Sequence, residues 1–389
     1  ALEVAAGAAW AGKRGLVTMK MSGINVMADS LLSIAHSGVR GALVIYAVDD
    51  VGTYYGMVEQ DSRHYAHLAS LPLLMPASPE ETYALTLLAF QVSQATGAPV
   101  LLLATTAVAN AITTMKVGSL EPRPASSPAR FERDLAKFTK ATPQWCLEQH
   151  ADALRRLEHA GEICAQAPGV NHVTPAVCGQ AHPGVIVAGV SATYLEELRR
   201  RAPERYESIA VLKIGQIHPL PRRIVREFLR ELDRVLVLEE LEPLIETEVL
   251  AELAEMGHIA IVHGKRRGEL PRVGDYSIEL VERALEMLLR EAAIDRGDYE
   301  RRERADIEDE GALEASRGEG GEGAPEASAG ATRKGATSCV APWQQDDKQV
   351  TQRDQASQVA QTLLPMARAL EFCPGCPHRM SYYALKRAI

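Results

Sequence analysis

The sequence predicts an α/β protein with two doubly wound, mostly parallel sheets, joined by a helical segment and followed by a disordered linker. Continuous apolar runs such as GALVIYAV (41–48) alternate with helical patterns, which is typical of strands buried on both faces of a parallel sheet. This alternation occurs in two separate stretches of the chain. Beyond residue 293 the apolar periodicity ends and Gly, Ala, Glu and Ser dominate, a composition that favours disorder.

The first α/β stretch supplies three expected strands, at 15–19, 41–48 and 99–103. Between these strands, residues 24–37 and a segment that starts at Ser78 show helical patterns. Ser78 is a good N-cap because Pro79 follows at the first helical position and Glu81 stands at the third. Strands that alternate with helices in this way predict a parallel sheet with helices on both faces.

A helical connector follows, and then a second α/β stretch with four strand–helix pairs. The expected strands are 184–189, 209–214, 234–239 and 258–262, and the expected helices are 193–201, 221–232, 245–256 and 276–292. The predicted domain organisation is a first α/β domain, a connector, a second α/β domain, the linker and the start of a further domain, at 1–127, 128–177, 178–293, 294–362 and 363–389.

The amino-acid composition and the net charge exclude some classes of protein. The chain has 46% hydrophobic and 24% charged residues, as ordinary folded proteins do, and its net charge of −9 argues against a nucleic-acid-binding protein. No stretch has the pattern of a membrane span or of a signal peptide. Six mostly scattered cysteines in 389 residues are typical of a reducing compartment, so we expect a cytoplasmic protein.

The loop that follows the second expected strand is a candidate site, because ligands bind at the carboxyl ends of strands in parallel sheets. This loop is rich in glycine and tyrosine and ends in the polar cluster EQDSRH (59–64). Arg63 is its candidate functional residue. The alternative is structural: Asp61 and Ser62 would cap a helix over 63–70, and Arg63 would face solvent.

Cys373 and Cys376 form a CxxC pair, and two thiolates at this spacing can bind one metal ion or one face of a cluster. A site with four ligands needs two more thiolates or imidazoles, so the pair is half of such a site. A pair of free or redox-active thiols is the alternative interpretation.

Charged residues also stand at the ends of two other expected strands, where we interpret them as structural and not as functional. Glu239 and Glu240 end the apolar run RVLVLEE, and carboxylates in that position usually cap the next helix, which is expected to start after Pro243. Lys20, just past the first strand, is interpreted as a solvated strand end, with contact to a ligand as the alternative.

Common catalytic motifs are missing from the sequence. It contains no Walker A loop, no HExxH and no GxGxxG after the first strand, and GVSAT (189–193) fails the GxSxG pattern at its last position. A nucleotide-binding P-loop, a zinc protease site and a hydrolase elbow are therefore not expected.

Six motifs that follow one another along the chain resemble those of a known family. They are ALEVAAGAAWAGKRGLVTMKMSGINVMADSLL, VDDVG, EQDSRHYA, VLKIGQIHPLP, DRVLVLEELEP and LEFCPGCPHR. Together they strongly resemble the alpha subunit of indolepyruvate:ferredoxin oxidoreductase. The similarity covers residues 1–292 and 363–389, whereas the segment 294–362 does not match well.

The resemblance implies a catalytic subunit that uses thiamine diphosphate, Mg²⁺ and 4Fe–4S clusters. It implies a pyrimidine-binding domain within 1–127, a domain of the transketolase C-terminal type within 178–293, and a diphosphate-binding domain that CPGCPHR would open. The implied reaction converts an aryl pyruvate such as indolepyruvate and coenzyme A to an acyl-CoA, with electrons passing to ferredoxin. The implied assembly is a dimer of heterodimers with a beta subunit, without nucleic acid or membrane.

The resemblance also implies roles for particular residues. Arg63 matches an arginine that faces the substrate carboxylate, and Ser22 and Gly23 match a loop that lies against the cofactor. Cys373 and Cys376 resemble a CxxC that holds a 4Fe–4S cluster. The glutamate that activates the cofactor would lie upstream of residue 1, and the GDG…N magnesium motif is missing, so we expect this chain alone to be inactive.

Three alternatives stay open at this point. Another 2-oxoacid:ferredoxin oxidoreductase, acting on pyruvate or 2-oxoglutarate, is one. A non-catalytic α/β binding module would use the CxxC pair for zinc or redox chemistry, and a transketolase-like transferase would share the two-sheet layout without a cysteine motif. Iron with acid-labile sulfide in the full-length protein would favour the oxidoreductase, and zinc alone the binding module.

Overall fold

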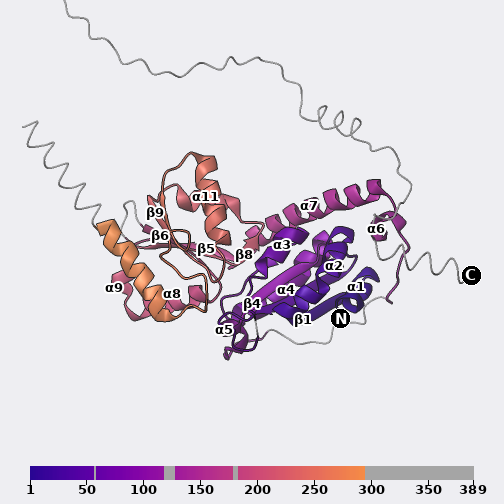
Figure 1. Cartoon of the computed structure of the whole chain (residues 1–389), viewed down its shortest axis with the longest axis horizontal. Coiled ribbons are helices and arrows are strands. Elements are labelled where there is room, and N and C mark those ends of the chain that lie inside the picture. Colours follow the sequence, from indigo (N-terminus) through magenta and orange to yellow (C-terminus); the bar gives the residue numbers. More distant parts are fainter. Residues whose placement is uncertain (57, 118–127, 178–182, 294–389) are drawn as a thin grey trace, which may run out of the picture. The chain divides into compact units, whose positions relative to one another are not determined.

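The computed structural model describes residues 1–56, 58–117, 128–177 and 183–293 (Figure 1). The expected linker, together with Cys373 and Cys376, lies outside the described residues. The predicted fold class is confirmed, because the described residues form two mostly parallel, five-stranded sheets with helices packed against them. None of the helices that the structure describes is long and apolar enough to span a membrane.

The first sheet has the strand order β1–β2–β4–β3–β8. Its strands are β1 (Arg14–Lys20), β2 (Ala42–Asp49), β3 (Leu73–Leu74), β4 (Val100–Thr105) and β8 (Gln216–His218). The first four strands are parallel, and β8 pairs antiparallel with β3, so that Leu73 lies opposite His218. The first sheet is therefore completed by a strand from the second α/β stretch of the sequence.

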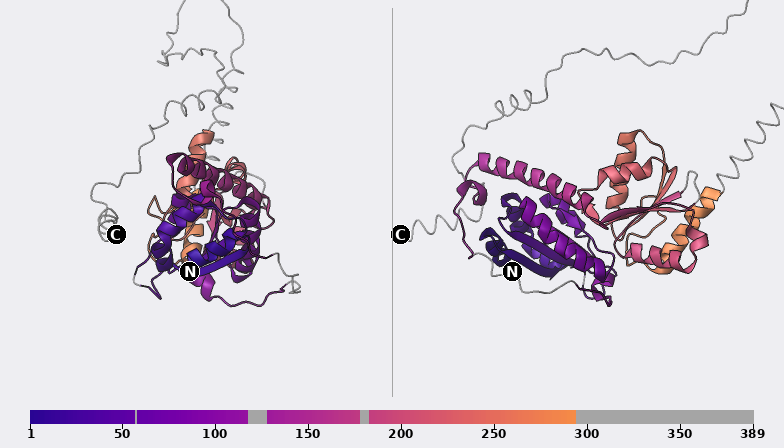
Figure 2. Two further views of the ribbon diagram at one scale, coloured as in Figure 1. Left: turned by 90° about the vertical axis from the view of Figure 1, so that its right-hand side faces the viewer. Right: turned by 180° about the vertical axis from the view of Figure 1, so that it is seen from behind.

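Helices cover both faces of the first sheet. They are α1 (Leu2–Trp10), α2 (Met21–Ser37), α3 (Arg63–Ala69), α4 (Pro79–Thr96), α5 (Thr106–Asn110), α6 (Leu135–Phe138) and α7 (Pro143–Gln166). Leu43 and Ile45 of β2 share a core with α1, α2 and α3, whereas Val44 packs with α4 and α7. Alternate side chains thus enter opposite cores, as a strand buried on both faces requires. The long helix α7 packs against α2 and α4 (Figure 2).

The second sheet has the strand order β10–β9–β6–β7–β5. Its strands are β5 (Asn171–Thr174), β6 (Pro183–Ala188), β7 (Ala210–Ile214), β9 (Arg234–Leu238) and β10 (Ile261–His263). Its helices are α8 (Val190–Arg201), α9 (Pro203–Tyr206), α10 (Arg222–Leu229), α11 (Leu244–Met256) and a last helix over 278–293. The edge strand β5 pairs antiparallel with β7 and was not expected, because its sequence NHVT contains no apolar run.

The expected start of α4 is confirmed in atomic detail. The Ser78 hydroxyl accepts a hydrogen bond from the Glu81 N–H at 3.3 Å, and Pro79 occupies the first turn of the helix. The Glu81 carboxylate in turn accepts the Ala77 N–H at 2.9 Å. Gly97 ends the helix with a φ of 74°, a left-handed conformation that glycine adopts at little cost.

Candidate functional site

A cavity of about 340 Å³ opens at the carboxyl ends of β1, β2 and β4. Parallel strands bring their carboxyl ends to one edge of the sheet, which is where such folds bind ligands. Met19, Tyr46 and Val48 contribute apolar walls, and the polar lining comes mainly from Lys20, Asp50 and Thr106. The cavity therefore offers both a surface for a flat ring and groups for hydrogen bonding.

Asp50 is the fixed centre of the polar lining. Its carboxylate accepts the Tyr55 N–H at 2.7 Å and the Thr106 hydroxyl at 3.1 Å, and it lies 3.2 Å from the Lys20 ammonium. Burial alone would raise the pKa of Asp50, but these hydrogen bonds and the nearby cation outweigh burial and lower its pKa. Asp50 is thus an ionised carboxylate that positions Lys20, whose side chain is 35% exposed at the mouth of the cavity.

The loop at 51–56 closes over this ion pair. Lys20 donates a hydrogen bond to the Tyr55 carbonyl, which ties the loop to the end of β1. A Cβ at Gly56 would come within 2.7 Å of Met21 Cε and within 2.9 Å of Asp50 Oδ2 and Lys20 Nζ, so a larger residue would displace these side-chain ends.

A second cavity of about 260 Å³ adjoins the first and shares Tyr55, Thr106 and Asn110 with it. Glu240, at the end of β9, lines this second cavity. Glu240 is buried and its Oε2 has no hydrogen-bond partner among the described residues. Burial raises the pKa of Glu240, and the Thr105 hydroxyl and then the Tyr276 N–H, at 3.5 Å from Oε1, offset this only in part. A buried carboxyl with a free oxygen beside a cavity can exchange a proton or a hydrogen bond with a ligand.

Arg63 lies buried between the two sheets, with 2% of its side chain exposed. Its Nε donates to Asp61 Oδ1 at 2.9 Å, and its Nη1 donates to Glu239 Oε2 at 2.5 Å. Its Nη2 donates to the carbonyls of Glu240 and Glu242 at 2.8 and 2.7 Å. Desolvation would lower the pKa of Arg63, but the two carboxylates raise it above the ordinary value. The interpretation that Arg63 faces solvent is wrong, because these partners from the second α/β stretch enclose it.

The start of α3 also differs from the expectation. Asp61 accepts the Arg63 N–H at 3.0 Å, as predicted for a residue before a helix. The Ser62 hydroxyl makes no capping bond and instead donates to Asp49 at 2.5 Å. Burial raises the pKa of Asp49 to about 7, although its hydrogen bonds with Ser62 act in the opposite direction.

Glu239 is confirmed as the cap of α11. Its carboxylate accepts the N–H groups of Ile245 and Glu246 at 3.1 and 2.9 Å. A carboxylate at a helix N-terminus satisfies free N–H groups and complements the helix dipole. The same carboxylate forms an ion pair with Arg63, so the Glu239 side chain both caps α11 and links it to α3.

Within the residues that it describes, the structure does not bring Ser22, Gly23 and Arg63 together at one site. Ser22 and Gly23 stand in the first turn of α2, directly after the cavity residue Lys20, and a Cβ at Gly23 would approach Met19 Cβ to 2.8 Å. Arg63 is not one of the described residues that line either cavity. The contacts of Ser22 and Gly23 with a cofactor, and of Arg63 with a substrate, stay predictions.

Thr106 is one of the cavity residues that sequence reasoning missed. It follows β4, which lies beside β2 in the sheet, and its hydroxyl reaches Asp50 at the end of β2. A signal was present, because polar residues end two neighbouring buried strands of the sheet. It could not be interpreted without knowing that β2 and β4 are neighbours.

Comparison with known proteins shows that the chain is similar to indolepyruvate oxidoreductase subunits. Residues 192–296 match the protein family described as an indolepyruvate oxidoreductase domain. The whole chain is 32% identical, over 394 residues, to indolepyruvate oxidoreductase subunit IorA of Methanothermobacter thermautotrophicus, of which it covers 52%. The corresponding subunit of Archaeoglobus fulgidus is 34% identical over 283 residues, which are 72% of this chain and 43% of that protein.

The chain thus spans about half the length of the curated relatives it matches. Among solved structures, a 2-oxoglutarate:ferredoxin oxidoreductase from Magnetococcus marinus is similar in fold, with a TM-score of 0.53 at 16% sequence identity. That similarity covers 74% of this chain and 55% of the other. The resemblance carried by the six sequence motifs is therefore confirmed.

Proposed function

We propose that this chain is part of the catalytic subunit of an indolepyruvate:ferredoxin oxidoreductase that uses thiamine diphosphate. The observation that carries the proposal is the similarity to indolepyruvate oxidoreductase subunits over the whole chain. The proposed reaction of the complete protein is the oxidative decarboxylation of an aryl pyruvate with coenzyme A to an acyl-CoA. Electrons would pass through 4Fe–4S clusters to ferredoxin, and a beta subunit would complete a dimer of heterodimers.

The two adjoining cavities fit the pyrimidine end of thiamine diphosphate. Tyr46 and Val48 offer apolar contact to a flat ring, and Glu240 lines the second cavity. When bound, thiamine diphosphate supplies an electron sink for the loss of carbon dioxide from a 2-oxoacid. The diphosphate end requires Mg²⁺ with oxygen ligands, which the resemblance assigns to a motif that this sequence does not contain.

Lys20, Asp50 and Glu240 are the residues of this chain that are best placed to act on ligands. Asp50 and the Tyr55 carbonyl hold the Lys20 ammonium at the mouth of the first cavity, where it attracts an oxoacid carboxylate or a phosphate. The Thr106 hydroxyl fixes the orientation of Asp50. The Glu240 carboxyl, whose pKa is raised by burial, holds a proton more readily than an exposed glutamate does and can donate it within the second cavity.

Arg63 is proposed to orient the carboxylate of the oxoacid, as the resemblance implies. Its guanidinium already binds two carboxylates, so its geometry suits this group, and a substrate would replace one of the present acceptors. In the complete enzyme, Arg63→Ala should raise KM for the oxoacid more than KM for coenzyme A. Equal changes in the two constants, in a variant shown to be folded by circular dichroism, would restrict Arg63 to its structural contacts.

The proposed function is tested on the full-length protein with its partner subunit, purified without oxygen. Indolepyruvate, coenzyme A and thiamine diphosphate should together support reduction of a viologen dye, and omission of any one should abolish it. Strict preference for pyruvate or 2-oxoglutarate would correct the substrate and leave the enzyme class intact. Failure to reduce the dye with every 2-oxoacid, in protein that contains intact clusters, would refute the proposal.

A further inference from the structure

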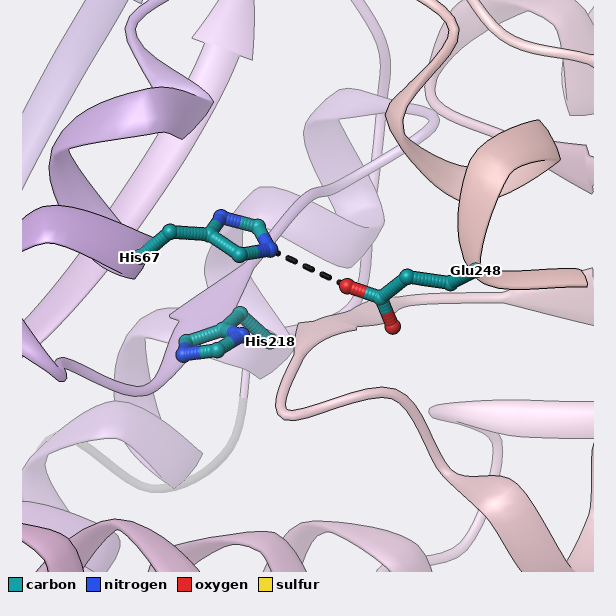
Figure 3. Close-up of side chains that lie close together, drawn as sticks. All are labelled: His67, His218 and Glu248. Atoms are coloured by element: carbon teal, nitrogen blue, oxygen red, sulfur yellow. Dashed lines mark hydrogen bonds and ion pairs between the residues drawn. The ribbon is translucent and has the colours of Figure 1, made fainter. Parts of the chain in front are cut away.

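Two histidines and a glutamate from three separate elements meet away from both cavities. They are His67 in α3, His218 at the end of β8 and Glu248 in α11 (Figure 3). Each offers one ligand atom, and these atoms all lie within 4.8 Å of one another. Because the three residues are far apart in sequence, only the packing of the second α/β stretch on the first brings them together.

Two contacts hold the His67 ring in one orientation, with Nε2 facing Glu248. Its Nδ1 lies 3.3 Å from the Arg63 carbonyl, to which an Nδ1–H can donate. Its Nε2 lies 3.0 Å from Glu248 Oε1, to which an Nε2–H donates, and this hydrogen bond raises the pKa of His67. A bound divalent cation would take the place of that proton. Histidines that bind metals commonly donate their other N–H to a carbonyl or carboxylate, which fixes the tautomer and the ring.

His218 contributes an imidazole whose hydrogen-bonding capacity is unused. Its ring packs against that of His67, with the ring centroids 4.1 Å apart. Its Nδ1 is buried and has no hydrogen-bond partner among the described residues. Burial, followed by the proximity of His67, lowers the pKa of His218 to about 3, so the ring is neutral and keeps a lone pair. A buried polar atom without a partner is costly, and a bound cation would remove this cost.

The cluster of His67, His218 and Glu248 is also accessible from solvent. The side chains of His67 and Glu248 are each 32% exposed, so an ion can reach the site without unfolding of the chain. The Glu248 carboxylate supplies negative charge against a divalent cation. Two imidazoles and one carboxylate form the ligand set of many zinc sites, in which a water takes the fourth position.

We propose that His67, His218 and Glu248 bind a divalent transition-metal ion of the Zn²⁺ type, which ties α3 and β8 to α11. Zinc–ligand distances of about 2.0–2.2 Å place tetrahedral ligand atoms about 3.4 Å apart. In the present structure the three ligand atoms lie within 4.8 Å of one another. The ion would lie beside the Arg63 contacts and add a second link between the elements that Arg63 already joins. This site is independent of the proposed oxidoreductase activity.

The test uses the 389-residue chain with Cys373→Ser and Cys376→Ser, so that the CxxC pair cannot bind the metal. After removal of metal with a chelator, Zn²⁺ is titrated by calorimetry and Co²⁺ by visible absorption. We expect one equivalent of Zn²⁺ to bind, a Co²⁺ spectrum typical of tetrahedral nitrogen and oxygen ligands, and an increase in Tm.

Three variants decide whether these side chains form the site. His67→Ala and Glu248→Gln should each lower the Zn²⁺ affinity by about 10-fold or more, since loss of even an outer contact costs that much. Glu248→Gln preserves the shape of the side chain and serves if His67→Ala unfolds. His64→Ala is the matched control, because His64 is exposed on the same helix α3. Failure of the parent chain to bind one equivalent of Zn²⁺, or affinities that are equal in all variants, would overturn the proposal.

Discussion

The carboxyl edges of the two sheets share a sequence feature, a pair of adjacent carboxylates, but the two edges have different roles. A strand of each sheet leads into two adjacent carboxylates, Asp49-Asp50 after β2 and Glu239-Glu240 after β9. In each pair the first carboxylate is buried against protein donors, and the second lines a cavity.

The two edges differ in the residues that satisfy their buried carboxylates. Asp49 and Asp50 are satisfied by nearby segments of the same α/β stretch, including Ser62 and Lys20. Glu239 accepts hydrogen bonds from the start of α11 and also from Arg63, which is 176 residues away in the sequence. The first edge therefore stays open around its cavity, whereas the second edge is used to join the two sheets. Paired acidic residues at a strand end do not by themselves indicate catalysis.

The largest expected effect comes from the contacts that join the sheets. Arg63→Met leaves Asp61 and Glu239 buried without their cation, and should lower the free energy of unfolding by about 3–5 kcal/mol. Urea denaturation of this chain measures the change. The matched control is Arg200→Met, which removes an exposed ion pair to Glu197 and should change the free energy of unfolding far less. Similar losses in the two variants would refute the role assigned to the buried contacts.

A smaller effect, visible as a pH dependence, is expected at the first edge. The pKa of Asp49 is raised from 3.8 to about 7 in the folded chain, so the folded state binds this proton more tightly than the unfolded state does. The stability that Asp49 contributes is therefore fully present below pH 4 and is lost as the pH rises through about 7. Asp49→Asn should flatten the fall in unfolding free energy between these pH values.

The neighbouring residue supplies the control for this titration. The pKa of Asp50 is lowered, so its contribution has the opposite sign and is lost as the pH falls through its folded pKa. Asp50→Asn should leave the decline near neutral pH in place. If Asp49→Asn and Asp50→Asn change the pH profile in the same way, the opposite pKa shifts assigned to these two carboxylates are contradicted.

The strands and the start of α4 could be predicted from the sequence, but the joining contacts could not. The apolar runs that became β2 and β6 are unambiguous because both faces are buried. The edge strands β5 and β8 are short and pair with distant segments, so no local pattern marks them. Arg63 was identified as important, but the pairing with Glu239 depends on packing across 176 residues, which one sequence does not reveal.

The most direct test of the account is the activity of Lys20→Met in the complete enzyme, with Lys116→Met as an exposed control from the same sheet domain. Loss of a charged hydrogen bond costs about 1.5–3 kcal/mol, so kcat/KM for indolepyruvate should fall about 10-fold or more. The Lys116→Met enzyme should keep the activity of the parent. Unchanged kcat/KM in the Lys20→Met enzyme would show that the open edge of the first sheet is not the binding site.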